Sequence, residues 1–253
     1  MESITRIIFI GILIGGLFFT EDSTAQKKGG IEVSWYYPKD SVRYEQDFPG
    51  QDYHVDRTEF GKTTMLIHVK SSVGTFDYIL KKKILRTEKF EGGYVDVYGT
   101  KPDGTNGVVR KDYMEPYSLT EHNLYAFVYL YDHGGFLEKA RFQDFGNVVY
   151  WPEFDYPNCF AADEDKDGVP EFYLTYSGFS DGLDPTEVKQ IVYTIPEVSK
   201  GKPLTKSKAV RYLIKDGETD PEDYRDSFDA QWKKLPKSVQ SRSLKILNGK
   251  KTK

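Results

Sequence analysis

Apolar residues recur at roughly every second position between residues 31 and 214, in short runs rich in Val, Ile, Tyr and Phe. Gly, Asp, Asn and Pro separate these runs. Because successive side chains of a β-strand point to opposite faces, this period predicts strands joined by turns. The expected strands cover residues 31–37, 64–69, 76–84, 94–98, 108–110, 124–131, 136–145, 148–151, 172–176, 188–194 and 209–214. The pattern predicts a mainly β fold with antiparallel, meander or sandwich-like sheets.

The run at residues 124–131 is apolar on both faces. One face is aliphatic and the other aromatic, with Leu124, Ala126, Val128 and Leu130 against Tyr125, Phe127, Tyr129 and Tyr131. A strand of this kind fits the middle of a sheet, and we expect its aromatic face to pack under a second layer. Stacking on a sugar ring is the alternative for that face.

Two glycine-containing segments predict hairpin turns, namely Asp103-Gly104 and residues 132–135. Glycine tolerates the positive φ angles that tight hairpin turns require. We therefore expect the strands on either side of each segment to pair with one another.

The carboxyl end changes to a helical pattern. The segment Asp220-Pro221-Glu222-Asp223 combines a capping side chain, a proline at the first helical position and acids in the first turn. Apolar residues then recur at helical spacing at Tyr224, Phe228, Trp232 and Leu235, and Val239, Leu244 and Leu247 indicate a second short helix. We expect a β domain over residues 26–219 and a C-terminal helical cap with a basic tail over residues 220–253. A partner-binding helix is the alternative.

The amino terminus has the pattern of an export signal. Arg6 precedes an apolar run over residues 7–19, and Ser23 and Ala25 are small residues at the positions that a signal peptidase requires. The run is shorter than the ~20 apolar residues that span a bilayer comfortably, although an uncleaved anchor is the alternative. Residues 1–25 are therefore predicted to be a signal peptide, and the protein is expected in the periplasm, on the cell surface or in the medium, with no stable membrane span.

Composition narrows the possible partners and chemistry. The formal net charge of −4 gives no basic footprint, so no nucleic-acid partner is expected. Cys159 is the single cysteine, which excludes a disulfide within the chain. We expect it to be a buried apolar residue, and the alternative is a nucleophile that would need a histidine partner.

Acids at alternating positions form the main chemical motif. In the segment 163–171, carboxylates stand at loop positions 1, 3, 5 and 9, and glycine stands at position 6. This spacing directs several hard oxygens at one centre, and Ca²⁺ takes six to eight such ligands. The predicted ligands are the side chains of Asp163, Asp165, Asp167 and Glu171 and the backbone carbonyl of Val169. The alternative is a polar turn whose acids only accept backbone hydrogen bonds.

The loop is not an EF-hand, because position 12 is Leu174 and strand-like residues follow. It resembles instead the calcium loops of FG-GAP and VCBS repeats, which have acids at positions 1, 3 and 5, glycine at 6, often proline at 8 and an acid at 9 before a strand. Pro170 matches position 8, whereas Glu171 stands where those repeats usually carry Asp. Those repeats occur in tandem and this chain has one copy, so the propeller fold is not implied.

A second resemblance is to exported bacterial proteins loosely labelled surface polysaccharide biosynthesis proteins. The similar features are the signal peptide, the single loop opening a Tyr-rich strand, and the segment 182–189. That resemblance implies a cell-envelope role and supplies no catalytic residue. Asp181, Asp184 and Glu187 form a weaker acidic group, for which we expect turn capping, with return to the same ion as the alternative.

Two functions follow as expectations. The first is a non-enzymatic, calcium-stabilised β protein of the cell envelope with a glycan or an envelope protein as partner. The second is a glycan-active enzyme with a carboxylate pair that the sequence does not identify. No Gly-x-Ser-x-Gly, His-Glu-x-x-His or Gly-rich phosphate motif is present. Residues 150–156 are the candidate aromatic platform, with buried packing as the alternative.

Overall fold

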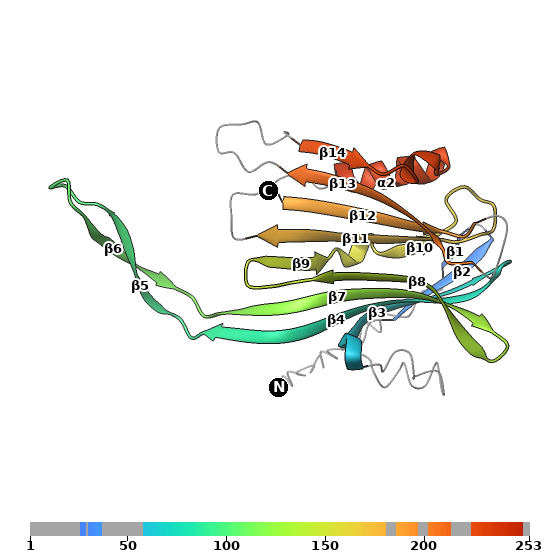
Figure 1. Cartoon of the computed structure of the whole chain (residues 1–253), viewed down its shortest axis with the longest axis horizontal. Coiled ribbons are helices and arrows are strands. Elements are labelled where there is room, and N and C mark those ends of the chain that lie inside the picture. The colour runs from blue at the N-terminus through green and yellow to red at the C-terminus, as the bar shows by residue number, and fades with distance from the viewer. Residues whose placement is uncertain are drawn as a thin grey trace, which may run out of the picture.

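Two antiparallel β-sheets, a two-stranded ribbon and one helix near the carboxyl end make up the described chain (Figure 1). The computed structural model describes residues 26–28, 30–36, 58–180, 186–196, 202–213 and 224–249. The predicted mainly β, antiparallel fold is confirmed. The predicted signal peptide, residues 1–25, lies outside the described residues.

The first sheet has six strands, each antiparallel to its neighbour. Their order is β1 (Gln26–Lys28), β2 (Ile31–Tyr36), β3 (Lys62–Ser71), β4 (Gly74–Phe90), β7 (Tyr117–Asp132) and β8 (Gly135–Phe145). β7 lies between β4 and β8, which confirms the central position predicted for residues 124–131. Its aliphatic face enters the main core, while Tyr125, Phe127 and Tyr129 pack with Phe60 on the other side. The aromatic face is therefore used for packing.

The second sheet carries the acidic loop. Its strands run in the order β10 (Phe160–Ala162), β11 (Glu171–Ser180), β12 (Thr186–Thr194), β13 (Thr205–Leu213) and β14 (Tyr224–Phe228). β9 (Tyr150–Phe154) also pairs with β11, farther along the edge that β10 occupies, and the 3-10 helix η3 (Tyr156–Asn158) connects the two. Expected strand 148–151 is therefore shifted toward the carboxyl end.

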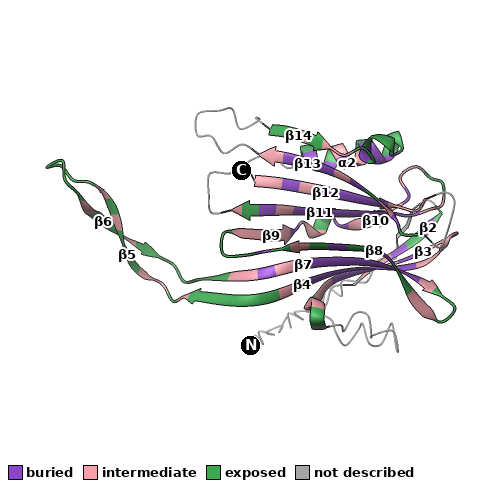
Figure 2. Cartoon of the chain, viewed as in Figure 1, coloured by how far each residue is buried: buried purple, intermediate pink, exposed green. Residues whose placement is uncertain are grey.

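The inner faces of the two sheets pack on one apolar core. The Phe172 ring lies 5.5 Å from that of Phe76 and 5.7 Å from that of Tyr78, centroid to centroid. The Tyr78 hydroxyl donates a 3.1 Å hydrogen bond to the Tyr173 carbonyl of the other sheet. Figure 2 shows the buried residues along the strands of these two sheets, which together with α2 form the body of the molecule. This packing holds β10 and β11, and hence the loop between them, in a fixed place.

A helix covers the outer face of the second sheet. α2 (Lys237–Asn248) packs Val239, Ile246 and Leu247 onto a second apolar cluster. The predicted second short helix is therefore confirmed. α2 is too short to cross a membrane, and no helix in the described parts of the chain is long and apolar enough to do so.

The prediction of a helix beginning at Asp220 is wrong for residues 224–228, which form a strand. Residues 220–223 lie outside the described chain, while Tyr224–Phe228 form β14, paired with β13. The 3-10 helix η4 (Trp232–Lys234) follows. The reason is tertiary: Tyr224 lies on the Arg211 guanidinium, 3.7 Å from it, and Phe228 stacks on Trp232. The second sheet thus continues past the expected boundary at residue 219.

A ribbon of two strands extends far from the body. β5 (Gly93–Thr100) and β6 (Asn106–Met114) pair only with one another and continue the outer ends of β4 and β7 (Figure 1). The turn at Asp103-Gly104 closes this ribbon, with Gly104 at φ 83°. The segment 132–135 closes the β7–β8 hairpin. Both predicted turns are therefore confirmed.

Candidate metal centre

The acidic loop connects two paired strands, so its ends are fixed close together. β10 and β11 are antiparallel neighbours, and Ala162 lies opposite Glu171 in the register. Asp163, Asp165 and Asp167 each offer one carboxylate oxygen, and these three oxygens lie within 4.8 Å of one another. The structure therefore brings together the three alternating aspartates, and the group could hold a metal ion.

Backbone geometry produces this convergence. Lys166 and Gly168 have positive φ angles of 64° and 82°, which reverse the chain twice within the loop. A side chain on Gly168 would be strained at that φ, and its Cβ would lie 3.2 Å from Ser72 Oγ. Gly168 is thus required both for the reversal and for the close approach of the β3–β4 turn.

The aspartates also accept hydrogen bonds from the loop backbone. The amide of Val169 donates to Asp167 Oδ1 at 2.7 Å, and the amide of Asp167 donates to Asp165 Oδ1 at 3.4 Å. The polar-turn interpretation of the loop therefore describes real contacts. It does not exclude a metal ion, because each carboxylate has a second oxygen and further lone pairs.

Asp163 is the most informative of the three. Asp163 is only 8% exposed. Its Oδ2 accepts hydrogen bonds from the amides of Gly168 at 3.1 Å and Gly30 at 3.3 Å. Oδ1 is buried and has no hydrogen-bond partner among the described residues. An unpaired buried carboxylate oxygen is costly unless a cation or proton compensates it.

Glu171 is buried beside this group. It is 5% exposed, and its Oε2 accepts a 2.9 Å hydrogen bond from the amide of Glu164. Burial raises the pKa of Glu171 to about 8, and the charges of Asp165, Asp163 and Asp167 add to the increase. Burial and then the charge of Asp167 likewise raise the pKa of Asp165. Without a cation, the loop is thus a site of mutual carboxylate repulsion.

The remaining predicted site residues divide into three cases. Val169 lies within the loop, and ligation by its carbonyl stays a prediction. Asp181 and Asp184 lie outside the described residues. Glu187, on β12, forms a 2.7 Å ion pair with Lys189. The suggestion that Glu187 caps a turn or returns to the same ion has no support in these contacts.

Sequence reasoning missed three residues that hold the loop in place. Gly30 donates to Asp163, the Ser72 hydroxyl donates to the Gly168 carbonyl at 3.0 Å, and Arg242 of α2 lies 3.4 Å from Glu164. None carries a local sequence signal, because each is more than 70 residues from its partner. Together they connect the loop to the β1–β2 turn, to the β3–β4 turn and to α2.

Comparison with known proteins adds no relative. No family model, no curated protein and no solved structure matches this chain. The similarity of the loop to FG-GAP and VCBS repeats and the similarity to exported polysaccharide-related proteins therefore stay predictions from the sequence.

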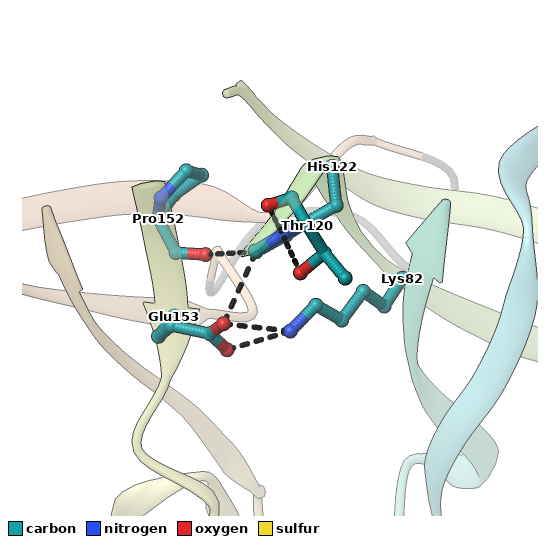
Figure 3. Close-up of polar contacts among 5 residues, drawn as sticks. All are labelled: Lys82, Thr120, His122, Pro152 and Glu153. Carbon is teal, nitrogen blue, oxygen red and sulfur yellow. Dashed lines mark hydrogen bonds and ion pairs between the residues drawn. The ribbon is translucent and has the colours of Figure 1, made fainter. Parts of the chain in front are cut away.

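A second polar cluster joins the two sheets (Figure 3). His122 Nδ1 lies 2.9 Å from the Thr120 carbonyl and Nε2 lies 2.7 Å from the Pro152 carbonyl. Glu153 Oε1 lies 3.3 Å from His122 Nε2 and 2.7 Å from Lys82 Nζ. His122 is 1% exposed, so its ring is closed to a substrate. The cluster is structural.

The candidate aromatic platform at residues 150–156 is mostly used for packing. Phe154 is buried and its ring lies near those of Phe142 and Tyr156. The Tyr150 hydroxyl donates to Asp144 Oδ2 at 3.0 Å and accepts from Lys189 Nζ at 3.2 Å. The alternative of packing thus describes this segment better than an open platform does. Cys159 is buried, as expected, and its Sγ lies 3.3 Å from the Thr175 carbonyl.

Proposed function

We propose that this chain is an exported, non-enzymatic protein of the cell envelope whose β fold is stabilised by Ca²⁺ and whose role is an interaction with a glycan or another envelope protein. The observation that carries the calcium part is the buried Oδ1 of Asp163, which has no hydrogen-bond partner in the described chain and belongs to a group of converging carboxylates. Export rests on the signal pattern of residues 1–25.

The donor set favours calcium over other ions. The available ligands are the carboxylates of Asp163, Asp165, Asp167 and Glu171 and the carbonyl of Val169, which are all hard oxygens. Magnesium requires a tight octahedron and keeps its water, whereas calcium accepts the irregular shells that loops provide. The dication would also offset the burial and the mutual repulsion that raise the pKa of Glu171 and Asp165.

The position of the loop supports a stabilising role. Its contacts with Gly30, Ser72 and Arg242 connect the first strands, the second sheet and α2. An ion that orders the loop would therefore strengthen contacts between segments far apart in the sequence. A ligand that binds only the folded state stabilises that state by mass action.

A pocket lies beside Arg242, which contacts the acidic loop through Glu164. It has a volume of about 210 Å³ and is lined by Asn158, Arg242, Lys245, Ile246 and Gly249. A glycosidase requires two carboxylates that flank the scissile bond, and this lining contains none. The raised carboxylate pKa values belong to the acidic loop itself.

The test is thermal unfolding in calcium and in chelator. At a free calcium concentration about a hundredfold above the dissociation constant, binding adds roughly 2.7 kcal/mol, which raises the Tm by roughly 5 to 10 °C for a domain of this size. Asp165→Ala should abolish this shift. In chelator the same variant should be at least as stable as the natural protein, because one repelling carboxylate has been removed.

Glu115→Ala is the matched control, since it removes an exposed acid far from the loop and should keep the whole calcium effect. A Tm that is the same in calcium and in chelator would refute the calcium site. Magnesium at the same concentration should produce a smaller shift than calcium.

A further inference from the structure

The arm, residues 84–119, is the part of the molecule that its own fold leaves uncovered. It comprises the outer ends of β4 and β7 together with β5 and β6 (Figure 1). β5 alone has eight residues and spans about 27 Å at ~3.4 Å per residue. Figure 2 shows the arm largely exposed and intermediate, in contrast to the body.

Exposed apolar side chains are concentrated in the arm. It holds most of the large hydrophobic residues that are exposed in the described chain: Ile84, Leu85, Tyr94, Tyr98, Val109, Tyr113, Met114, Tyr117 and Leu119. A ribbon of two strands is at best marginally stable in water, and a third strand or a covering layer stabilises it. Such a concentration of apolar surface marks an interaction site.

The tyrosines share one face of the ribbon with an ion pair. Tyr94, Asp96 and Tyr98 alternate along β5, so their side chains point to the same side. Opposite them on β6, Tyr113 faces Tyr94 and Lys111 faces Asp96, with Lys111 Nζ 3.5 Å from Asp96 Oδ1. Tyr94, Tyr98 and Tyr113 are 75%, 73% and 53% exposed. The face thus carries aromatic rings around one acid and one base.

This face is complementary to itself. A two-fold axis along the ribbon exchanges the positions of β5 and β6, so Tyr94 would meet Tyr113 of the second copy, and Asp96 would meet its Lys111. An isologous contact requires this reciprocity. Between Gly93 and Met114 the acids and bases balance, with Asp96, Asp103 and Asp112 against Lys101, Arg110 and Lys111. Two arms therefore meet without net repulsion, and neither attracts a strongly charged partner.

The available area also fits a dimer. Taking roughly 200 Å² for a fully exposed tyrosine side chain, the three tyrosines offer roughly 400 Å². A standard interface buries about 800 Å² per partner. The three rings thus supply about half of that area. Neighbouring side chains on the same face, including Val108 and Lys111, add to it. We propose that the arm is a dimerisation surface on which a second copy of this chain packs its own arm.

Sedimentation velocity of the purified protein over roughly 1 to 100 µM tests the proposal. The natural chain should reach the mass of a dimer. Tyr94→Ser with Tyr98→Ser should raise the dissociation constant by at least about tenfold, since two of the central aromatic contacts are lost. Phe179→Ser removes an exposed aromatic ring from the body and should leave the dissociation constant unchanged.

A charge exchange tests the predicted contact between Asp96 of one copy and Lys111 of the other. Lys111→Asp places an acid opposite Asp96 of the second copy and should weaken the dimer. Adding Asp96→Lys restores the ion pair within each arm and the predicted pairing between the two arms, so the double variant should recover the dimer. These positions are exposed, and far-UV circular dichroism checks that each variant folds.

Three results would overturn the proposal. They are a monomer at every concentration, a dimer insensitive to the tyrosine substitutions, and a double variant that stays as weak as Lys111→Asp. A monomer at every concentration would mean that the exposed surface of the arm binds a different molecule. None of them bears on the calcium loop, which lies on the second sheet and contributes no residue to the arm.

Discussion

His122 shows how a single buried residue joins the two sheets. Both ring nitrogens face carbonyl oxygens, which only accept hydrogen bonds, at 2.9 and 2.7 Å. The Thr120 hydroxyl also lies 3.2 Å from Nδ1, and Glu153 Oε1 lies 3.3 Å from Nε2. The ring therefore connects β7 to β9 through directional contacts.

His122→Ala should lower the free energy of unfolding by about 2 to 3 kcal/mol, because it removes a buried ring and its hydrogen bonds to Thr120 and Pro152. Urea unfolding measures the loss. His133→Asn is the control: His133 is exposed in a hairpin turn at φ 46°, a conformation that asparagine tolerates. A control variant as unstable as His122→Ala would contradict this assignment.

The sequence predicts the contacts of a residue better when its partners are close in the chain. The convergence of Asp163, Asp165 and Asp167 follows from their spacing and from Gly168. Gly30, Ser72 and Arg242 could not be predicted, because their contacts with the loop exist only after distant segments have packed.

At the scale of elements, the apolar period predicted where strands lie but not how far they extend. The expected strand 76–84 covers only the inner half of β4, whose outer half is exposed and charged and lacks an apolar alternation. Hydrogen bonds to β7, as far as Phe90 opposite Tyr117, continue it. Strand length here follows from pairing, which is not a local property.

β14 is the element that the sequence pattern assigned to the wrong class. Tyr224, Phe228 and Trp232 fit a helical stripe, but Tyr224, Asp226 and Phe228 also fit the period of a strand. Arg211 decides between the two. It donates two 2.8 Å hydrogen bonds to Asp226 of β14 and a further one to the Leu247 carbonyl of α2. The strand and the helix end thus share one buried guanidinium.

Arg211→Met should destabilise the fold by about 3 kcal/mol, because it leaves the partly buried carboxylate of Asp226 without its cation. Urea unfolding gives the magnitude, and hydrogen exchange should show faster exchange in β14 and α2 than in the first sheet. Arg225→Met is the comparison: Arg225 is exposed and lies over the Tyr212 ring, so it should cost less than about 1 kcal/mol. Equal losses for both variants would contradict the central position of Arg211.

At the scale of the whole molecule, the body and the arm are separate in their packing. No residue of the three buried clusters lies between residues 91 and 116. The sequence predicted the strands of the arm but not its projection, because residues 94–98 and 108–110 alternate much like strands of the body. Whether a strand joins a large sheet depends on which strands it pairs with, and this is not a local property of the sequence.

Replacing residues 91–116 with Asn-Gly should therefore leave the body folded. Phe90 and Tyr117 are directly opposite one another, and a two-residue Asn-Gly turn connects such a pair. We expect the free energy of unfolding to change by less than about 1 kcal/mol and the Tm by less than about 4 °C. Calorimetry measures both. Collapse of the body would show that the arm contributes to its stability, and a shortened chain that still dimerises would contradict the role of the arm.

The hydrogen bond from Gly30 to Asp163 has a consequence for how the chain matures. These residues are 133 positions apart, so the β1–β2 turn cannot complete its contacts until well over half of the polypeptide has been synthesised. Long-range closure of this kind slows folding. If the chain is exported amino end first, as proposed above, the β1–β2 turn would reach its partner only after residue 163 had followed it across the membrane.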